Sequence, residues 1–573
     1  MCGICAYKTK ENAVKFAIES LKILEYRGYD SCGISFFKNG EIETVKSLID
    51  IDDLKKKTEN KTSNLVIGHT RWATHGGVTL KNAHPHLSSS NKIALVHNGI
   101  IENYKTLKEN LNCAFQSETD SEVLVNLIES EKGSLIEKVI SASKKVEGTF
   151  AIAVIENGEL AVGKRESPLY VAYFDGGVVA TSDISAFVGN VKEFYILNDN
   201  EFASLNENKI EFFNENGEKI KKNAEILPKI TQNFKIFDKT HMESEIKETK
   251  IVLKNTLKEY LNFGVFSDLN LPKNIQEINL IACGTAFHSA LMGAEFFKEQ
   301  GINSHTYVAS EFRYGREILN KNALYIFVSQ SGETADTIAC AKLLKEKKMH
   351  LLALTNTPNC VLNRICENVL PTFAGKEFAV ASTKAYCCQV FVLFIFSLFL
   401  SQKLQDNIDE LIKFTNEFQI QDFDKDLLNK ISSFQKIFFV GREKDYITAL
   451  EASLKLKEIS YINSIAIPAG ELKHGTLALV DENTLVIAIS TEENVREKLL
   501  SNLEEIRARG GEVVLVSNFS CKDYIKIPLQ TMRENFMPIV SIIPLQFFAL
   551  RMCEKLGYNP DKPKNLAKSV TVE

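Results

Sequence analysis

The sequence predicts a multidomain protein of mixed α/β and α+β class, with a sheet-rich N-terminal part followed by two similar, doubly wound α/β subdomains. Three observations carry this prediction: a length of 573 residues, a strand-rich texture over roughly the first 235, and a strand–helix alternation that recurs from about residue 275. One hydrophobic core does not support a chain of this length, so several domains are expected.

The composition of the chain limits which class of protein it can be, which partners it suits and which compartment it suits. Hydrophobic residues make up 45% of the chain and charged residues 25%, as in ordinary globular domains. A net charge of −5 provides no global basic field that would favour nucleic acid or an anionic membrane. The N-terminus lacks the basic and apolar regions of a signal peptide. The twelve cysteines are scattered along the chain and do not form the dense pattern of a disulfide framework, which suits a reducing compartment. We therefore expect a cytoplasmic protein without nucleic-acid or membrane partners.

The N-terminal part alternates short apolar runs with Gly, Asn or charged turns, which is typical of strands. Between the runs, Glu11–Tyr26 and Ser121–Ile128 carry apolar residues at helical spacing. This pattern predicts stacked, largely antiparallel sheets flanked by helices. The predicted strands are 2–8, 32–38, 65–76, 93–101, 149–156, 159–166 and 178–183.

Beyond a polar stretch around Asn198–Lys239, the repeating unit becomes a strand followed by a helix, which indicates parallel, doubly wound sheets. Recurrence of the pattern over roughly 150 residues indicates an internal duplication. The apolar run Val390–Leu400 falls short of the roughly 18–20 residues that span a bilayer, and predicts a buried core helix. The predicted divisions are 1–220, a linker 221–250, subdomains 251–425 and 426–562, and a tail 563–573.

Three interpretations are open for the cysteine behind the initiator methionine. Cys2 could be a small apolar residue at a strand start, or Cys2 and Cys5 could form a redox or zinc pair. A redox pair should follow a strand and open a helix, and a structural zinc site needs a second ligand pair, which is absent. The third interpretation is that removal of Met1 frees the Cys2 α-amine. This amine titrates near 7.7–8.0 and could take the thiol proton, so that the thiolate attacks a carboxamide and releases ammonia.

Four motifs support the third interpretation: EYRGYDS at 25–31, HTRWATHG at 69–76, VHNGIIEN at 96–103 and SETDSE at 117–122. Together with the initial CGI they resemble the class II glutamine amidotransferase domain, an N-terminal-nucleophile hydrolase with an αββα sandwich, over about the first 220 residues. The resemblance implies that Cys2 is the nucleophile, with Asn98 and Gly99 as oxyanion-hole donors. It also implies a glutamine pocket in which Arg71 holds the α-carboxylate, Asp120 holds the ammonium, and Trp72, Thr74 and His75 shape the lid.

Simpler interpretations stand beside these roles. Arg71 and Asp120 could be an ordinary surface pair. Five of the ten histidines gather in this region, at positions 69, 75, 84, 86 and 97. They lie on predicted strands and turns without a thiolate pair or a helical H-x-x-x-H, so we expect hydrogen-bonded structural residues and no metal.

The segment Ser329–Thr334 (SQSGET) follows a predicted strand and precedes a predicted helix. A hydroxyl-rich turn at a helix N-terminus suits a phosphate group, because free N–H groups and the helix dipole favour an anion. Neither a G-x-x-x-x-G-K-[ST] motif nor a G-x-G-x-x-G motif is present, so no nucleotide is implied. In isolation such a turn could also be a plain N-cap.

Further motifs extend the likeness over nearly the whole chain: residues 282–285 (ACGT), 309–314 (ASEFRY), 380–384 (VASTK), 449–460, 469–475 and the terminal NLAKSVTVE. They resemble the pair of sugar isomerase (SIS) subdomains of the glucosamine-6-phosphate synthase family. The resemblance implies conversion of fructose 6-phosphate and glutamine to glucosamine 6-phosphate and glutamate, the first step of UDP-N-acetylglucosamine synthesis. It also implies an internal ammonia channel gated near Trp72, and neither a metal nor an organic cofactor.

Glu451, Lys455 and Glu458 share one face of a predicted helix, which by itself could be a solvated ion-pair ladder. The resemblance implies that Glu458 carries a proton between C1 and C2 of the sugar, beside Lys455. It further implies that His474 opens the sugar ring from the neighbouring subunit of a homodimer, and that Lys568 reaches the sugar from the tail. The implied phosphate and sugar contacts are Thr285, Ser329, Gln330, Ser331, Thr334, Val380 and Ser382.

The chain departs from the family pattern at three places: Thr249-Lys250 in the domain junction, Thr476 after K-H-G, and Ala286 after A-C-G-T. None removes a proposed catalytic group, although Ala286 removes a polar contact near the sugar pocket. Amidophosphoribosyltransferases and asparagine synthetases share the N-terminal half, but the motifs that should follow are absent. A SIS sugar-phosphate sensor, which binds without turnover, is the other alternative.

Overall fold

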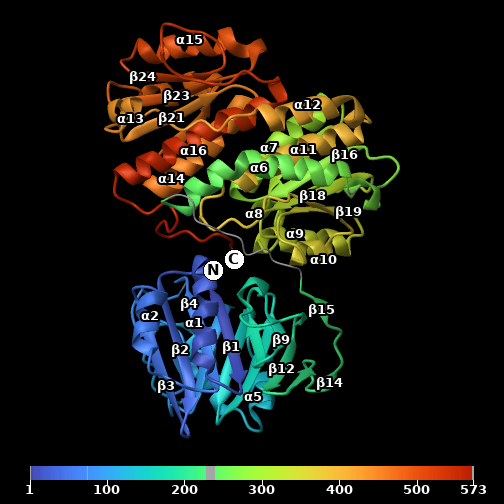
Figure 1. The fold of residues 1–573 in the computed structure, drawn as a ribbon, viewed down its shortest axis with the longest axis vertical. Coiled ribbons are helices and arrows are strands. Elements are labelled where there is room, and N and C mark those ends of the chain that lie inside the picture. The colour runs from blue at the N-terminus through green and yellow to red at the C-terminus, as the bar shows by residue number, and fades with distance from the viewer. Residues whose placement is uncertain (1, 74, 228–238, 263, 571–573) are drawn as a thin grey trace. The chain divides into compact units, whose positions relative to one another are not determined.

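A computed structural model describes the chain except residues 1, 74, 228–238, 263 and 571–573. It divides into two compact units, Met1–Phe234 with Ser569–Glu573, and Lys235–Lys568. They are called the first and the second unit here, and Figure 1 shows the elements of each.

The first unit contains two antiparallel sheets. The larger has the order β15-β11-β9-β10-β1-β4-β2-β3, and the smaller the order β14-β13-β12-β8-β7-β6-β5. The larger sheet consists of β1 (Gly3–Thr9), β2 (Ser31–Lys38), β3 (Glu41–Ser47), β4 (Leu65–Arg71), β9 (Tyr170–Phe174), β10 (Gly177–Thr181), β11 (Glu193–Ile196) and β15 (Glu225–Ile226). The smaller consists of β5 (His86–Leu87), β6 (Ile93–Ile101), β7 (Gly148–Glu156), β8 (Glu159–Arg165), β12 (Glu201–Asn206), β13 (Lys209–Phe213) and β14 (Lys219–Ile220).

Successive side chains of β1 point to opposite faces of its sheet, and each face packs into a different core. Ile4 and Ala6 pack into the core between the sheets, whereas Cys5 and Tyr7 face the core under α1 (Ala13–Leu24) and α2 (Ile51–Thr58). On the far side, α4 (Asp120–Ser130) and α5 (Leu135–Ser143) cover the smaller sheet, with α3 (Tyr104–Glu109) beside α4. These layers form the expected αββα sandwich.

The second unit contains two parallel five-stranded sheets of identical topology, ordered β17-β16-β18-β19-β20 and β22-β21-β23-β24-β25. The repeated order confirms the predicted duplication. The first sheet consists of β16 (Glu277–Ala282), β17 (Asn303–Val308), β18 (Ala323–Ser329), β19 (His350–Thr355) and β20 (Asn368–Pro371). The second consists of β21 (Lys436–Gly441), β22 (Ile465–Pro468), β23 (Thr484–Ser490), β24 (Glu512–Ser517) and β25 (Ile525–Pro528).

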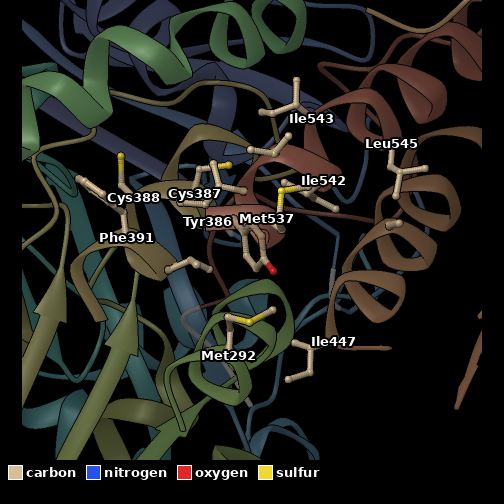
Figure 2. Packing of buried hydrophobic residues seen from close by; sticks show 14 of the residues in the cluster. Met292, Tyr386, Cys387, Cys388, Phe391, Ile447, Met537, Ile542, Ile543 and Leu545 are labelled. Atoms are coloured by element: carbon tan, nitrogen blue, oxygen red, sulfur yellow. The ribbon is translucent and has the colours of Figure 1, made fainter. Parts of the chain in front are cut away.

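One hydrophobic core joins the facing sides of these two sheets. Its central helices are α6 (His241–Asn262), α7 (Gly284–Glu299), α11 (Lys384–Leu400), α14 (Lys444–Ser460) and α16 (Met537–Lys555), with α12 (Leu404–Glu417) and α13 (Lys425–Ile431) at its margin. Figure 2 shows side chains of α7, α11, α14 and α16 packed together there. The outer face of the first sheet is covered by α8 (Ala309–Phe312), α9 (Ala335–Glu346) and α10 (Val361–Ile365), and that of the second by α15 (Arg496–Arg507).

The long apolar segments are core helices. The run Val390–Leu400 lies in α11, which is buried over nearly its whole length, as the sequence predicted. Among the described residues, Glu534–Lys555 is long and apolar enough to cross a membrane, yet 94% of its most apolar stretch is buried within the fold.

The segment expected to be a linker, 221–250, contains regular structure. β15 pairs with β11 at Glu225–Ile226, and α6 begins at His241. Within this polar stretch, β14 and β15 are short strands at the sheet edges, and their side chains are exposed or half-buried.

Candidate active sites

The first unit places Cys2 at the start of β1, half-buried beside the end of β4. The Cys2 Sγ accepts a hydrogen bond from the backbone N–H of Trp72 at 3.2 Å and lies 3.5 Å from the Trp72 carbonyl oxygen. Burial raises the pKa of the Cys2 thiol, against the Trp72 hydrogen bond and the charge of Arg71. A thiol in this environment needs a nearby base before it can act as a nucleophile.

Asn98, on β6, contacts Cys2, and Gly99 follows it on the same strand. The Asn98 Nδ2 donates to the Cys2 carbonyl oxygen at 2.9 Å, and the Asn98 Oδ1 lies 3.0 Å from the Nε2 of His69. Gly99 has φ +139°, and a Cβ at this position would lie 2.1 Å from the carbonyl oxygen of Thr149. The backbone at position 99 therefore takes a course that a side chain would prevent.

Arg71 ends β4 with its side chain directed at the segment 75–77. Its guanidinium donates to the carbonyl oxygens of His75 at 2.6 Å, Gly76 at 3.0 Å and Gly77 at 3.2 Å. Arg71 is 3% exposed and Asp120 is 4% exposed, so the alternative of an ordinary surface pair does not hold. Arg71 thus orders a segment that includes His75, one of the predicted lid residues.

The other predicted glutamine-binding residues lie around this segment. Asp120 begins α4, and its Oδ2 accepts the backbone N–H of Ile101 at 2.9 Å. The Trp72 ring meets Tyr29 edge to face at 6.0 Å, and the His75 ring meets Tyr104 in the same way at 5.6 Å. Thr74 lies outside the described residues.

Four of the five clustered histidines are fully buried. The ring of His84 stacks on His69 at 4.1 Å and meets His86 at 4.6 Å, while the Nδ1 of His97 lies 2.9 Å from the Ser121 Oγ. Within the described part of the chain, both ring nitrogens of His84 lack a partner, contrary to the expectation of hydrogen-bonded histidines. No group of three or more His, Cys, Asp or Glu among these described residues is arranged to hold a metal ion.

We expect the first unit to lose stability as the pH falls from about 6.5. Burial lowers the pKa of His69 to about 3 and holds the pKa values of His84 and His86 well below 6.5. Each imidazole therefore takes up a proton in the unfolded chain before it does so in the fold, so acid favours unfolding by on the order of 1 kcal/mol per histidine per pH unit. Denaturant unfolding at pH 7.5 and 5.5, followed by the fluorescence of the single tryptophan, Trp72, checks this.

The matched control is His305→Asn, because His305 is exposed and belongs to the second unit. This variant should keep the pH dependence, whereas His84→Phe should reduce it. An equal denaturation midpoint at both pH values in the unaltered protein would contradict the expectation.

In the second unit, residues 329–334 form a turn between β18 and α9 that we call the serine loop. The Ser329 Oγ lies 3.0 Å from the Thr334 Oγ1 and accepts the backbone N–H of Gly332 at 3.0 Å. The Ser331 Oγ accepts the backbone N–H of Glu333 at 3.1 Å. Gly332 has φ +65°, and a Cβ there would lie 2.0 Å from the Sγ of Cys360. The loop is thus held in a fixed, compact form.

The serine loop lies at the point where the strand order of the first sheet reverses. β16 has β17 on one side and β18 on the other, and the turns that follow β16 and β18 begin α7 and carry the serine loop. The crevice between such turns is where open α/β sheets bind ligands. Thr285 lies in the first turn of α7, and Gln330 in the serine loop accepts the backbone N–H of Asn356 through its carbonyl oxygen at 3.1 Å.

The equivalent crevice of the second sheet contains a carboxylate of the chain itself. The Asp445 Oδ2 accepts the backbone N–H groups of Thr491 at 2.7 Å and Glu492 at 3.2 Å, and its Oδ1 accepts the Thr491 hydroxyl at 2.6 Å. These donors follow β23, the counterpart of β18. The duplicated sheets therefore differ at this position, and only the first presents a serine loop.

The three residues of the predicted helical face belong to one cluster on α14 that meets α7, in which Glu458 is half-buried. Glu451 and Lys455 are both fully buried, which excludes the alternative of a solvated ladder. The Glu451 Oε1 accepts the Thr285 hydroxyl at 3.1 Å, and the Glu451 Oε2 lies 2.7 Å from the His288 Nδ1. Lys455 donates to the Thr285 hydroxyl at 2.9 Å and pairs with Glu458 at 2.6 Å.

The charges in this cluster influence one another. Burial opposes the charge of Lys455, but the carboxylates of Glu451 and Glu458 outweigh burial and raise its pKa. Burial raises the pKa of Glu458, whereas the charges of Lys455 and Lys568 act to lower it. A carboxyl group with a raised pKa beside a lysine suits proton transfer near neutral pH.

Glu377, which the sequence did not single out, joins the tail to the start of α11. Its carboxylate accepts the Ser382 hydroxyl at 2.8 Å and the backbone N–H groups of Thr383 at 2.9 Å and Ala385 at 3.1 Å. It also forms a buried ion pair with Lys568. Although burial alone would raise it, the pKa of Glu377 is about 2, because Lys568 and these donors stabilise the carboxylate.

Two further predicted residues of the second unit, Val380 and His474, lie in different surroundings. Val380 is buried in the segment that leads to Ser382, next to Phe378 and Ala379, whose backbone N–H groups donate to Glu245 of α6. His474 is exposed at the end of a short helix, Ala469–His474, and within the described ranges no hydrogen bond or ion pair joins it to Glu458.

Sequence reasoning also missed His69 as a partner of Asn98, His288 as a partner of Glu451, and Asp30, whose Oδ2 accepts the backbone N–H of Ala73 at 2.8 Å. Asp30 and His69 lie inside motifs quoted from the sequence, so their position was a usable signal. His288 and Glu377 carry no such signal, because their partners are distant in the chain.

Comparison with known proteins agrees with both halves of the fold. A family model described as a glutamine amidotransferase domain matches residues 55–229, and a model described as a SIS domain matches residues 273–397 and 430–553. The C-terminal domain of glucosamine-fructose-6-phosphate aminotransferase from Francisella tularensis is similar at 30% identity and a TM-score of 0.52, covering 57% of this chain and 99% of that chain.

Relatives match over the complete sequences, with 100% of each chain covered. Identity is 40% to the glutamine–fructose-6-phosphate aminotransferase (isomerizing) of Caldanaerobacter subterraneus subsp. tengcongensis, and 38% to that of Clostridium tetani. Since this similarity extends over both units, the chain belongs to the isomerizing glutamine–fructose-6-phosphate aminotransferase family.

Proposed function

We propose that this chain converts fructose 6-phosphate and glutamine to glucosamine 6-phosphate and glutamate, using the two sites described above. The observation that carries the proposal is the pairing of two chemistries in one chain. The first unit sets Cys2 against the Asn98 amide, and the second sets a Glu458–Lys455 pair, of which Lys455 is fully buried, against Thr285 near a serine loop. One arrangement suits release of ammonia from an amide, and the other suits proton transfer on a sugar phosphate.

In the first unit, removal of Met1 exposes the α-amine of Cys2, which takes the proton from the Cys2 thiol. The thiolate attacks the carboxamide carbon of glutamine, and the Asn98 amide and the Gly99 N–H stabilise the oxyanion. The C–N bond breaks as the proton passes to the leaving nitrogen, and ammonia departs. Water then hydrolyses the thioester to glutamate and restores the thiol.

Recognition of glutamine requires opposite charges at the two ends of the pocket. The guanidinium of Arg71 binds the α-carboxylate and Asp120 binds the α-ammonium, with Trp72, Thr74 and His75 closing over the amino acid. In support, Arg71 already orders the 75–77 segment through three carbonyl oxygens.

In the second unit, the serine loop binds the phosphate of fructose 6-phosphate through Ser329, Gln330, Ser331 and Thr334, next to Thr285, Val380 and Ser382. After ring opening, ammonia adds to the C2 carbonyl and water is lost. Glu458, beside Lys455, then takes a proton from C1 as the nitrogen on C2 gains one. It delivers a proton to C2 as the C1 hydroxyl loses one, which yields the 2-amino aldose. Lys568 contacts the sugar from the tail, anchored by Glu377.

The exposed position of His474 supports ring opening by this residue from the partner subunit of a homodimer. Ammonia passes internally from Cys2 to the sugar, so that it is not lost to water. The enzyme acts in the cytoplasm, without a nucleic-acid or membrane partner.

The proposal is tested by incubating the purified protein with fructose 6-phosphate and glutamine labelled with ¹⁵N in the amide. We expect mass spectrometry to detect ¹⁵N-glucosamine 6-phosphate and an equal amount of glutamate. Sugar-phosphate binding without either product would instead support a SIS sensor. Glutamate without the aminosugar would indicate another class II amidotransferase.

A further inference from the structure

His69 lies directly behind the Asn98 side chain, within a buried chain of polar contacts that ends at Cys2. The Nε2 of His69 is 3.0 Å from the backbone carbonyl oxygen of His97 and 3.0 Å from the Asn98 Oδ1. On the other side, the Asn98 Nδ2 donates to the Cys2 carbonyl oxygen at 2.9 Å. His69 is completely buried.

The chemistry of these partners determines where the proton of His69 resides. A backbone carbonyl oxygen can only accept a hydrogen bond, so the His69 Nε2 carries the hydrogen. Because the same N–H faces Asn98, the amide atom turned toward His69 must be its oxygen. The Asn98 nitrogen is thereby turned toward Cys2, and one of its two hydrogens remains for an oxyanion.

On this basis we propose that His69 is a positioning residue, whose neutral Nε2–H holds the Asn98 amide with its nitrogen toward the oxyanion formed from glutamine. The inference rests on the proposed hydrolysis of glutamine at Cys2. Without this donor, the amide could turn over and present its oxygen to the oxyanion, which would repel the developing negative charge.

The surroundings of His69 favour this single state. The ring of His84 stacks on it at 4.1 Å, and the His69 Nδ1 has no hydrogen-bond partner among the described residues, so the ring makes its polar contacts through Nε2 alone. A charged imidazole would be both desolvated and close to Arg71. Among the described residues, the hydrogen bonds of the His69 ring go to His97 and Asn98 and to no proposed glutamine-binding side chain, so its effect should reach the reaction through Asn98.

The decisive comparison is between His69→Gln and His69→Met. The two side chains have similar length and both remove the imidazole, but only glutamine offers an N–H near the position of Nε2. With fructose 6-phosphate saturating, we expect glutamate release by His69→Met to show kcat about 10- to 100-fold lower with KM within about twofold, and His69→Gln to recover most of the loss.

The same substitution in an Asn98→Ala background tests the route of the effect. If His69 acts through Asn98, His69→Met should cost less than about twofold there. An equal loss in both backgrounds, or a raised KM with kcat unchanged, would overturn the inference. The matched control is His84→Phe, which removes no described hydrogen bond and should leave kcat within about twofold; a loss as large as that of His69→Met would also overturn it.

Two checks separate this inference from its premises. If the unaltered protein releases no glutamate, the proposed function fails, whereas normal release by both the protein and His69→Met rejects only the role of His69. Trp72 fluorescence reports whether the first unit is folded. If His69→Met is unfolded, His69→Phe, which keeps an aromatic ring against His84 but lacks the donor, replaces it in the same comparisons.

Discussion

Replacing Cys2 with alanine is expected to lower glutamine hydrolysis by at least about 10³-fold and to leave fructose 6-phosphate binding within about twofold. Alanine cannot form the thioester, and no nearby side chain of the described site offers a second thiol, since Cys5 faces the core on the other side of β1. Sugar binding should persist because Cys2 and the serine loop belong to different compact units. Glutamate release and calorimetric titration with fructose 6-phosphate measure the two effects.

Cys113→Ala is the matched control, because Cys113 is a half-buried thiol in the same unit with no proposed role. It should retain full glutamine hydrolysis. Turnover by Cys2→Ala at a rate near that of the unaltered protein would refute the nucleophile assignment, and loss of fructose 6-phosphate binding would contradict two separate sites. Intact-mass measurement should also find the active protein without Met1.

Replacing Glu458 with glutamine is expected to lower glucosamine 6-phosphate formation by about 10²- to 10⁴-fold while glutamine hydrolysis continues. Glutamine keeps the size of the side chain but cannot take a proton from C1. The fold should tolerate the change, because Lys455 keeps Glu451 as a buried partner at 3.4 Å. Parallel measurement of glutamate and aminosugar gives the ratio of the two reactions.

Lys457→Gln is the control on the same helix, since Lys457 is exposed next to Glu458. This variant should form glutamate and aminosugar in equal amounts. Equal amounts from Glu458→Gln would exclude proton transfer by Glu458. An equal fall in both products, with sugar binding lost, would point to a binding role instead.

Local structure was largely predictable from the sequence. Apolar runs and helical spacing placed β1, β2, β6, β7 and the helices α1, α4 and α11 within a few residues, because alternation and 3.6-residue spacing are properties of neighbouring residues. The internal duplication followed from the repeated strand–helix pattern, whereas the order of the strands in each sheet did not. The strands β14 and β15 were harder to predict, because short edge strands carry little hydrophobic signal.

For the active sites, the chemical groups and their motifs could be read from the sequence: a thiol behind the initiator, an Asn-Gly pair, a serine-rich turn and a carboxylate–lysine face. Which of these groups are buried, and which groups they contact, became visible in the folded chain. Thr285 and Glu451 meet across 166 positions of the chain, and Glu377 and Lys568 across 191. Such contacts depend on how distant elements pack. Packing also buries His69, which lowers its pKa, and brings Lys455 against Glu451 and Glu458, which raises its pKa despite burial. A pattern of neighbouring residues therefore predicts neither these contacts nor these pKa values.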